Sequence, residues 1–458
     1  MRTSSVHSKS FLENGGRFDA SFHLSEGIQS RAQVMNAPYP MTTIGAASQR
    51  IFHAGRWKRA YVSSKEHGIA LVGSSDMLKA DLSDIKLISR KYTPDMEDKI
   101  LKKGWILISC SGTIGNTVFT NEQHAEKLAS QDVIRIIPNN ILRTGFVYSF
   151  LSTSYGYNLL TQGTFGAVIQ HIEPQNVEQI PIPIMPDAFQ EKVDNLIQES
   201  VRLRDEANKA LISAKNALML YCEIPFHETS EKNETVIVPV SKLKDSFNTR
   251  LDPSFYVNDG LTWLSQLKKK TKNLGKCNIK SWYPGIFKRV YVTDGLPYIK
   301  GSELFDLDPF RKCEKLSRTR TPNLDELWLK EGMLMVSCAG ACGLSKIITK
   351  EYEEKQAIGS PDIIRIVSND TLFTTEYIFA YMQLPPVFSY MQSLKYGSVI
   401  ERFDISNLEN LPIVEPTPEL SEQITALVSL YNGNMYQAYK SEEQAIQIVE
   451  QEIDKWNS

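Results

Sequence analysis

Two stretches of this sequence end an apolar, strand-like run in Ser-Cys and continue into a small, glycine-rich loop. They read GWILISCSGTIGN at 104–116 and GMLMVSCAGACGL at 332–344. A loop of this kind after a strand could cradle a phosphate or form a catalytic turn. Neither copy has the GxxxxGK(S/T) pattern of a P-loop or the GxGxxG spacing of a dinucleotide site. The sequence therefore does not favour nucleotide binding by these loops.

The other residues that could do chemistry form no catalytic set. All seven histidines lie at or before His227, so a histidine-based mechanism cannot belong to both copies of the loop. DPSF at 252–255 resembles the Asp-Pro-Pro-aromatic loop of amino-methyltransferases but lacks the second proline. PDMEDK at 94–99 contains the letters of a nuclease site, without the spacing that would place its carboxylates on separate strands. Cys338 and Cys342 form a lone CxxxC, which lacks the second pair of a zinc site. We expect no catalysis, no metal site and buried, reduced thiols.

The glycine-rich loop is one part of a long internal repeat. Four further pairs of matching segments keep the same order along the chain, at offsets between 230 and 233 residues, against 228 for the loop. These pairs are RFDASFHL at 17–24 with RLDPSFYV at 250–257, KRAYV at 58–62 with KRVYV at 288–292, SQDVIRIIPNN at 130–140 with SPDIIRIVSND at 360–370, and GAVIQHIEPQNVEQIPIP at 166–183 with GSVIERFDISNLENLPIV at 397–414. Solenoid repeats are much shorter, about 20–50 residues. The chain is therefore predicted to contain two homologous domains.

Each repeat ends in a proline-rich segment followed by a long amphipathic helix. The first helix is predicted at 187–222, where apolar or small residues recur every three or four positions in an unbroken heptad seam. The second, within 417–458, has the same seam with one polar member, Glu442. Each helix would be roughly 50–60 Å long. We expect the two helices to pair with each other; the alternative is that each packs only on its own domain.

These patterns predict an α/β (α+β) fold with a pseudo-two-fold internal repeat. Two homologous α/β domains would be separated by two long antiparallel helices that form a coiled coil. The predicted order is a flexible tail at 1–16, the first α/β domain at 17–186, the first helix at 187–222, a linker at 223–249, the second α/β domain at 250–416 and the second helix at 417–458.

Composition places the chain among ordinary globular proteins and leaves binding as the main function to consider. It is 42% hydrophobic and 23% charged, and no run of eighteen apolar residues occurs that could span a membrane. The N-terminus lacks the apolar segment of a secretory signal, and the scattered cysteines fit a cytoplasmic protein. A net charge of −2 does not exclude nucleic acid, because a basic patch need cover only one face.

Basic residues alternate with aromatic residues in the first half of each repeat. Such residues can neutralise phosphates or make bidentate contacts to guanine, although any single cluster can equally be a solvated face. The candidate DNA-binding residues are Arg56, Lys58, Arg59, Arg90, Lys91, Lys288, Arg289, Arg311, Arg318 and Arg320.

The tandem architecture, with the opening R(F/L)D(A/P)SF, SCSGTIG and YGSVIERFDISNLENLPI, resembles the specificity subunits of Type I restriction-modification systems over about 17–456. That resemblance implies two target recognition domains, each reading half of a bipartite, asymmetric site in double-stranded DNA. The paired helices would act as a spacer and dock two adenine-N6 methyltransferase subunits, with a restriction or translocase subunit as a further partner. Catalysis and S-adenosylmethionine would belong to the partner methyltransferase, with no cofactor in this chain. The location would be the cytoplasm of a prokaryote.

The resemblance also suggests how the candidate residues divide. Lys58 and Arg59 match Lys288 and Arg289, so these pairs are expected to hold phosphate. Base contacts are expected in the segments where the repeats diverge, 50–103 and 282–330, and the shared glycine-rich loop is expected to be structural. Three alternatives stay open: a specificity subunit of a Type IIB or other methylation-based defence system, a protein scaffold that does not bind DNA, and a nuclease or methyltransferase in its own right.

Overall fold

The computed structural model of the chain describes residues 26–162, 171–226, 237–241, 251–340, 342–397, 399 and 401–457. The predicted tail, the RFDASFHL segment and most of the predicted linker lie outside these residues. The structure divides into two compact units: unit 1 comprises Met1–Asp205 with Gln437–Ser458, and unit 2 comprises Glu206–Tyr436. Unit 1 is therefore built from both ends of the chain.

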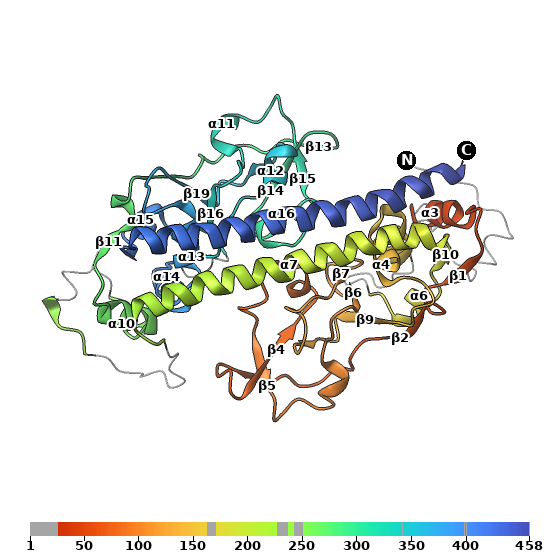
Figure 1. Ribbon diagram of the computed structural model, residues 1–458, viewed down its shortest axis with the longest axis horizontal. Coiled ribbons are helices and arrows are strands. Elements are labelled where there is room, and N and C mark those ends of the chain that lie inside the picture. Colours follow the sequence, from red (N-terminus) through yellow and green to blue (C-terminus); the bar gives the residue numbers. More distant parts are fainter. Residues whose placement is uncertain are drawn as a thin grey trace. The chain divides into compact units, whose positions relative to one another are not determined.

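Unit 1 contains two four-stranded sheets and a two-stranded ribbon (Figure 1). The first sheet is entirely antiparallel and consists, in spatial order, of β2 (Ser48–Phe52), β9 (Val133–Pro138), β6 (Ile106–Ser109) and β7 (Thr117–Phe119). The second sheet has β4 and β8 parallel and consists of β3 (Tyr61–Val62), β5 (Leu87–Ser89), β4 (Gly68–Val72) and β8 (Leu128–Ala129). The ribbon pairs β1 (Met41–Thr43) with β10 (Pro181–Pro183).

Short helices cover the first sheet of unit 1. They are α3 (Glu26–Met35), α4 (Thr144–Ser152), α5 (Ser154–Gln162) and α6 (Pro174–Glu178), with single 3-10 turns η1 (Asp76–Leu78), η2 (Glu97–Lys99) and η5 (Lys455–Asn457). The β-branched runs ILIS and VIRI are buried throughout: one face of β6 and β9 shares a core with these helices, and Arg135 on the other face of β9 reaches β8 of the second sheet. Phe146 and Phe150 of α4 join the same core.

Unit 2 repeats this topology strand for strand. Its first sheet is β12 (Ile279–Trp282), β19 (Ile363–Ser368), β16 (Leu334–Ser337) and β17 (Ser345–Ile347). Its second sheet is β13 (Tyr291–Val292), β15 (Glu314–Leu316), β14 (Leu296–Ile299) and β18 (Ile358–Gly359), and its ribbon pairs β11 (Thr271–Asn273) with β20 (Pro412–Val414). The duplication read in the sequence is thus a duplication of the fold, and the predicted α/β class with two sheet-containing domains is confirmed.

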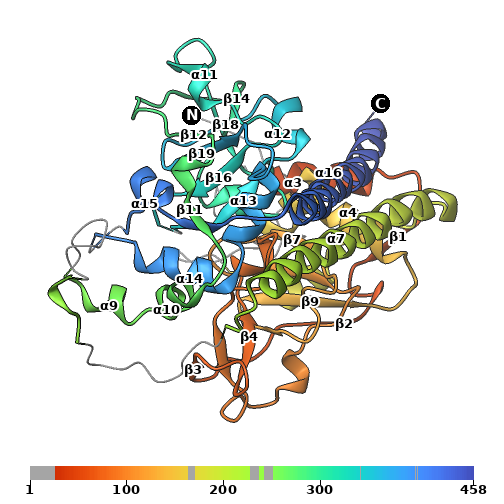
Figure 2. The same cartoon turned by 60° about the vertical axis from the view of Figure 1, so that its left-hand side comes forward.

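The helices of unit 2 follow the same plan, and Figure 2 shows α10 and α14 lying side by side. Asn258 caps α10 and also donates its side-chain amide to Ser389 O at 3.0 Å on α14. The remaining elements are α9 (Pro253–Tyr256), α10 (Asp259–Gln266), η3 (Leu274–Lys276), η4 (Glu303–Phe305), α11 (Leu324–Leu327), α12 (Lys350–Glu354), α13 (Thr375–Met382), α14 (Pro385–Ser393) and α15 (Ile405–Glu409).

Two long helices, α7 (Asp187–Cys222) and α16 (Pro418–Asp454), belong partly to each unit. In unit 1, Val193 and Ile197 of α7 share one buried core with Val449 and Ile453 of α16. In unit 2, the C-terminal half of α7 shares a core with the N-terminal half of α16, through residues that include Leu218 and Val428. The halves pair in opposite order, so the helices are antiparallel, as the heptad pattern predicts.

The buried surface of α7 is wider than the predicted seam. Ile197, Val201, Leu211 and Leu218 lie beside the seam and are buried. The ten seam positions are all buried or half-buried: Phe189, Val193, Leu196, Ser200, Leu203, Ala207, Ala210, Ala214, Ala217 and Tyr221. The helix therefore packs on the sheet-containing part of the chain as well as on α16, and the alternative that each helix packs only on its own domain is wrong.

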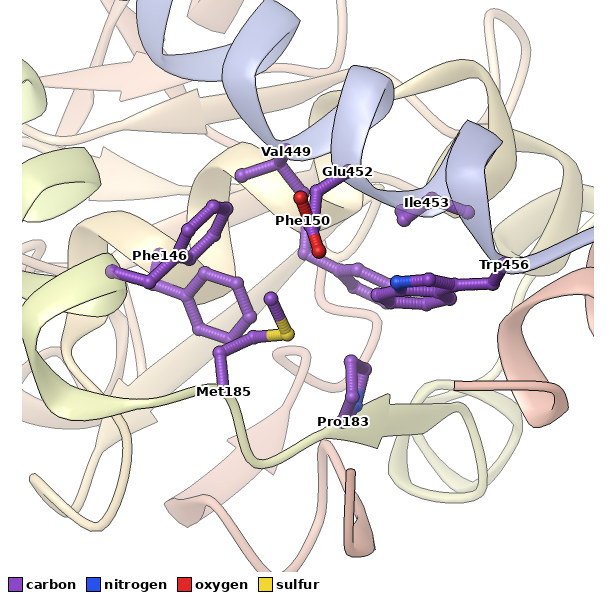
Figure 3. A pocket seen from close by; sticks show the side chains of 9 residues that line it. Phe146, Phe150, Pro183, Met185, Val449, Glu452, Ile453 and Trp456 are labelled. Atoms are coloured by element: carbon purple, nitrogen blue, oxygen red, sulfur yellow. The ribbon is translucent and has the colours of Figure 1, made fainter. Parts of the chain in front are cut away.

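The last turns of α16 are anchored in unit 1 by aromatic packing. Figure 3 shows Ile453 beside Trp456 and Val449 beside Phe150, in a pocket that Phe146, Pro183 and Met185 also line. Gln33 of α3 donates its side-chain amide to Ile453 O at 2.8 Å, and the Trp456 ring meets Tyr39 edge-on. The core of unit 1 is thus completed by the C-terminal end of the described chain.

The glycine-rich loop is the turn between β6 and β7, and its counterpart joins β16 to β17. The loop closes on Ser109: Gly115 N donates to Ser109 O at 2.8 Å, and Asn116 N donates to Ser109 Oγ at 3.0 Å. The equivalent amide of Gly343 donates to Ser337 O at 2.8 Å. Gly112 and Gly115 have φ values of 74° and 79°, which disfavour other residues. These contacts support the structural role expected for the loop.

We expect Gly115→Ala to destabilise unit 1 by about 2–4 kcal/mol, and Gly112→Ala by only about 1 kcal/mol. Both positions have a positive φ, but a Cβ on Gly115 would lie 2.9 Å from Thr161 Cγ2 and Tyr157 Cε2, whereas one on Gly112 meets nothing within 4 Å. Denaturant unfolding of the two variants checks this. Equal losses would mean that backbone strain alone, rather than crowding, sets the effect.

Unit 1 also buries a neutral histidine, His124, between β7 and β8. Its ring is 2% exposed, Nδ1 lies 2.7 Å from Asn121 Oδ1, and burial lowers its pKa from 6.5 to about 3. The folded state binds a proton on His124 less readily than the unfolded state does. The contribution of neutral His124 to stability is therefore fully present above about pH 6.5 and is lost as the pH falls toward 3. The loss from this residue should reach about 2 kcal/mol at pH 5.

We therefore expect His124→Gln to lose less stability than the wild-type chain between pH 7.5 and pH 5. The measurement is the free energy of unfolding of both proteins at the two pH values, with the difference between them isolating His124 from the carboxylates. Parallel pH profiles would contradict the assignment.

Candidate nucleic-acid interface

The second sheet of unit 1 brings four of the predicted basic residues to one end. Strand β3 begins just after Lys58 and Arg59, and the antiparallel strand β5 ends just before Arg90 and Lys91. The pairing continues one step beyond the strands, since Ser89 N donates to Ala60 O at 2.8 Å. We call these four residues basic edge 1.

The second sheet of unit 2 does the same with Lys288, Arg289, Arg318 and Arg320, which we call basic edge 2. Ser317 N donates to Val290 O at 2.9 Å, so the residues before β13 and after β15 again lie together. Two predicted residues fall outside the edges. Arg311 precedes β15 at the opposite end of that strand, and Arg56 lies farther back in the segment that leads into β3.

The register also shows a match between the repeats that the sequence comparison does not reveal. Ile88 lies opposite Tyr61, and Leu316 lies opposite Tyr291, so Arg90 and Arg318 occupy equivalent places in the two units. The sequence alone places both arginines in the divergent, base-reading set. Their equivalence instead groups them with the pairs expected to hold phosphate, and the offset of 228 residues, shorter than for KRAYV, hides it.

Some of the predicted cations are held by neighbouring side chains. Arg59 donates to Gln131 Oε1 at 2.7 Å and lies 3.5 Å from Asp132, with its guanidinium over the Trp57 ring. Arg311 is ion-paired to Asp308 at 3.4 Å. The other eight predicted residues are exposed or half-buried.

Three other edge arginines, Arg90, Arg289 and Arg318, have hydrogen bonds to neutral groups. Arg289 Nε donates to Tyr298 Oη at 2.7 Å, Arg90 Nε donates to Gly68 O at 2.9 Å, and Arg318 donates to Gln356 and lies over the Trp328 ring. Arg59 of basic edge 1 is thus ion-paired to a carboxylate, whereas the hydrogen bonds described for Arg289 and Arg318 of basic edge 2 go to neutral groups and Asp362 acts on Arg289 only electrostatically.

Exposed tyrosines accompany both edges, as the alternation of basic and aromatic residues in the sequence indicates, although no tyrosine is among the predicted DNA-binding residues. Tyr61 and Tyr291 open β3 and β13 and are 55% and 51% exposed. Tyr92 is 65% exposed, with Lys91 Nζ 5.6 Å from its ring centroid. A tyrosine can pack on a sugar or base and donate to a phosphate. The shared Tyr of KRAYV and KRVYV was the available signal.

Each unit fixes its second sheet to its first through a buried arginine. Arg135 in β9 is 0% exposed and donates to the carbonyl groups of Ala129, Ser130 and Val133, with Nη1 3.0 Å from Val133 O. Ala129 belongs to β8 of the second sheet, so the side chain joins the two sheets. Arg365 makes the same contacts in unit 2, to Gly359, Ser360 and Ile363. Burial lowers the pKa of both guanidinium groups to about 10, and they remain charged at neutral pH.

The repeated motifs meet at this junction. Cys110 N donates to Asp132 O at 3.0 Å, and Ile172 N donates to Cys110 O at 3.1 Å. The same two bonds join Cys338 to Asp362 and to Phe403. The Ser-Cys turn, the S-x-D-x-x-R segment and the end of the GAVIQHI segment are therefore parts of one inter-sheet contact, which explains why they occur twice.

The candidate catalytic groups have structural surroundings. Lys99 of PDMEDK is buried, donates to Pro94 O and Asp95 O, and lies over Trp57. Burial raises the pKa of the Cys110 thiol to about 12 and that of Cys338 to about 11, so both are protonated. Within the ranges described above, no cluster of histidine, cysteine and acidic side chains could hold a metal ion.

Arg289 should contribute more to phosphate binding than its counterpart Arg59. Arg59 is ion-paired to the Asp132 carboxylate, whereas Arg289 donates a hydrogen bond to the Tyr298 hydroxyl. We expect Arg289→Ala to reduce the slope of log affinity against log salt by about 0.9 for each phosphate that it leaves without a cation. Arg59→Ala should change the slope by less. DNA titrations at several salt concentrations measure both slopes, and a larger change for Arg59→Ala would contradict this ranking.

A family model described as the Type I restriction modification DNA specificity domain matches residues 52–214. This stretch is a Type I DNA specificity domain. The match confirms the resemblance drawn from the sequence, and it covers basic edge 1, the Arg135 junction and most of α7. Unit 2 carries the same sheet orders and the same buried arginine as the specificity domain.

Solved structures similar to this chain include an S subunit of a Type I restriction-modification system from M. genitalium and an HsdS subunit from Thermoanaerobacter tengcongensis. The first is 14% identical, with a TM-score of 0.33, over 92% of this chain and 96% of that one. The second is 13% identical, with a TM-score of 0.28, over 92% and 97%. No curated relative matches the chain. None of the helices in the described part is long and apolar enough to cross a membrane.

Proposed function

We propose that this chain is the DNA-sequence specificity subunit of a Type I-like restriction-modification complex. Unit 1 reads one half of a bipartite, asymmetric target in double-stranded DNA, and unit 2 reads the other. The observation that carries the proposal is that matched strands of the two units present a basic edge with an exposed tyrosine at the same place. The specificity-domain match over residues 52–214 supports it.

The basic edges divide by role. Arg59, Arg90, Arg289 and Arg318 occupy matched positions and position the duplex through its phosphates, because contacts shared by both units cannot distinguish two different half-sites. Base discrimination comes from residues without a counterpart. These are Arg56, Lys91 with Tyr92, and Arg320.

The long helices dock the adenine-N6 methyltransferase subunits, which carry the catalysis. Three large apolar side chains on these helices support a partner-binding face in unit 2: Leu220 is 80% exposed, and Ile212 and Leu430 are each 52% exposed. A contiguous exposed apolar patch marks a protein contact, and these three side chains are the proposed members of such a patch. The chain itself supplies recognition and no chemistry.

DNA selection tests the proposal. The chain is co-expressed with its neighbouring methyltransferase, and the fragments bound at moderate salt are sequenced. Enrichment of a two-part motif with a fixed gap is the expected result. A folded complex that enriches no motif would contradict it and favour a scaffold that does not bind DNA specifically.

A further inference from the structure

The two units differ at one buried place on the long helices. In unit 1, Glu442 of α16 accepts a hydrogen bond from the Tyr148 hydroxyl of α4 and is ion-paired to the Arg204 guanidinium of α7. The three residues are 2% (Tyr148), 7% (Arg204) and 8% (Glu442) exposed. We call them the polar trio.

The matched place in unit 2 is apolar. Shifting each member of the polar trio to its repeat counterpart, 231 residues away, gives Phe379, Met435 and Leu211. Phe379 and Leu211 are buried in the core of unit 2, and Met435 is half-buried. At this place one repeat therefore has a buried ion pair, and the other has three apolar side chains at the matched positions.

The repeat creates a choice of helix partner. The second half of α7 and the second half of α16 are equivalent, and in unit 1 the place beside Tyr148 and Arg204 is filled by α16. Two copies of the chain could instead pair α7 with α7 and α16 with α16, so that α7 of the second copy fills that place. Leu211 would then stand where Glu442 stands, and Arg204 would be buried without its carboxylate.

In the same two-chain assembly, the pairing of α16 with α16 in unit 2 is equally unfavourable. In unit 2, Glu442 of another copy would face Phe379 and Met435, which offer it no hydrogen bond. No other acceptor near Arg204 is described: even in the wild-type chain, its Nε has no hydrogen-bond partner among the described residues. The nearest acidic side chain on the same helix, Asp205, is held by Lys103 at 2.8 Å and by Glu122 N at 3.2 Å.

We infer that the polar trio selects the helix partner: unit 1 accepts the glutamate-bearing half of α16 and rejects the equivalent half of α7. A buried ion pair seldom adds stability over well-packed apolar residues, but removing one member leaves an uncompensated charge. Polar residues at single seam positions specify partners in this way in coiled coils. The polar trio thus favours pairing of α7 with α16 over pairing of α7 with α7 and of α16 with α16 between two copies of the chain.

The test replaces the polar trio by the residues that unit 2 uses, Tyr148→Phe with Arg204→Met and Glu442→Leu, in the full chain. Copies carrying two different affinity tags are co-expressed, one tag is captured, and the other is quantified, with light scattering to give the mass. We expect the triple variant to fold and to raise the co-captured fraction at least about tenfold over wild type. The charge-swapped pair Arg204→Glu with Glu442→Arg restores complementarity and should stay at the wild-type level.

Two results would overturn the inference. Co-capture by the triple variant at the wild-type level would mean that the polar trio does not choose the partner. Failure of the triple variant to fold would mean that the trio is needed for folding itself. Ile197→Val, a conservative change elsewhere on the same buried surface, is the matched control and should leave the co-captured fraction unchanged.

Discussion

Replacing Glu442 alone with leucine should lower the free energy of unfolding of unit 1 by about 3–5 kcal/mol. The substitution leaves Arg204 charged and buried, and it removes the acceptor of the Tyr148 hydroxyl. The two losses fall on the contacts of α16 with α7 and with α4 within unit 1. Hydrogen exchange of amides on α4 and α7, compared with denaturant unfolding, measures the loss for this unit.

The control for Glu442→Leu is the triple variant that also carries Tyr148→Phe and Arg204→Met. Because no charge is then left buried, most of the missing stability should return. If Glu442→Leu alone proves neutral, or if the triple variant is as unstable as the single one, the ion pair does not have the energetic role assigned to it.

Replacing Arg135 with methionine should destabilise unit 1 by about 2–4 kcal/mol. The change removes charge-assisted hydrogen bonds to three carbonyl groups, each worth about 1.5–3 kcal/mol, while the relief of burying the guanidinium offsets part of the loss. Methionine fills much of the same volume, so the cavity term is small. Amides of β8 should lose protection first, because Arg135 joins this strand to the first sheet.

Two matched variants separate this effect from the general loss of an arginine. Arg365→Met should reproduce the destabilisation in unit 2, where the same carbonyl contacts occur. Arg50→Met changes an arginine on the neighbouring strand β2 whose side chain is 53% exposed, and it should cost less than about 1 kcal/mol. Similar losses for Arg50→Met and Arg135→Met would contradict the junction role.

Much of the fold could be predicted because the repeat and the heptads are long-range patterns. The helix predicted at 187–222 coincides with α7, since the seam, an acidic first residue and the following proline all agree. Glu442 was visible as the polar member of the second seam. Its partners were not, because Tyr148 and Arg204 lie hundreds of positions away and no spacing rule connects them.

The candidate site was less predictable, for the same physical reason. Arg59 and Arg289 look identical in KRAYV and KRVYV, but Asp132 reaches the first and Tyr298 the second. Arg135 appears in the sequence as one cation in a β-branched run. Its side chain points inward onto the carbonyl groups of Ala129, Ser130 and Val133, two to six residues earlier, and this depends on how the chain turns between β8 and β9.

The most direct test of the central claim repeats the DNA selection with each basic edge removed in turn. One variant changes Lys58, Arg59, Arg90 and Lys91 to alanine, and the other changes Lys288, Arg289, Arg318 and Arg320, each in complex with the methyltransferase. If each unit reads its own half, the first variant should erase one half of the motif and the second variant the other, with the remaining half intact. Loss of both halves together in either variant, or retention of both in each, would contradict the assignment of one half-site to each unit.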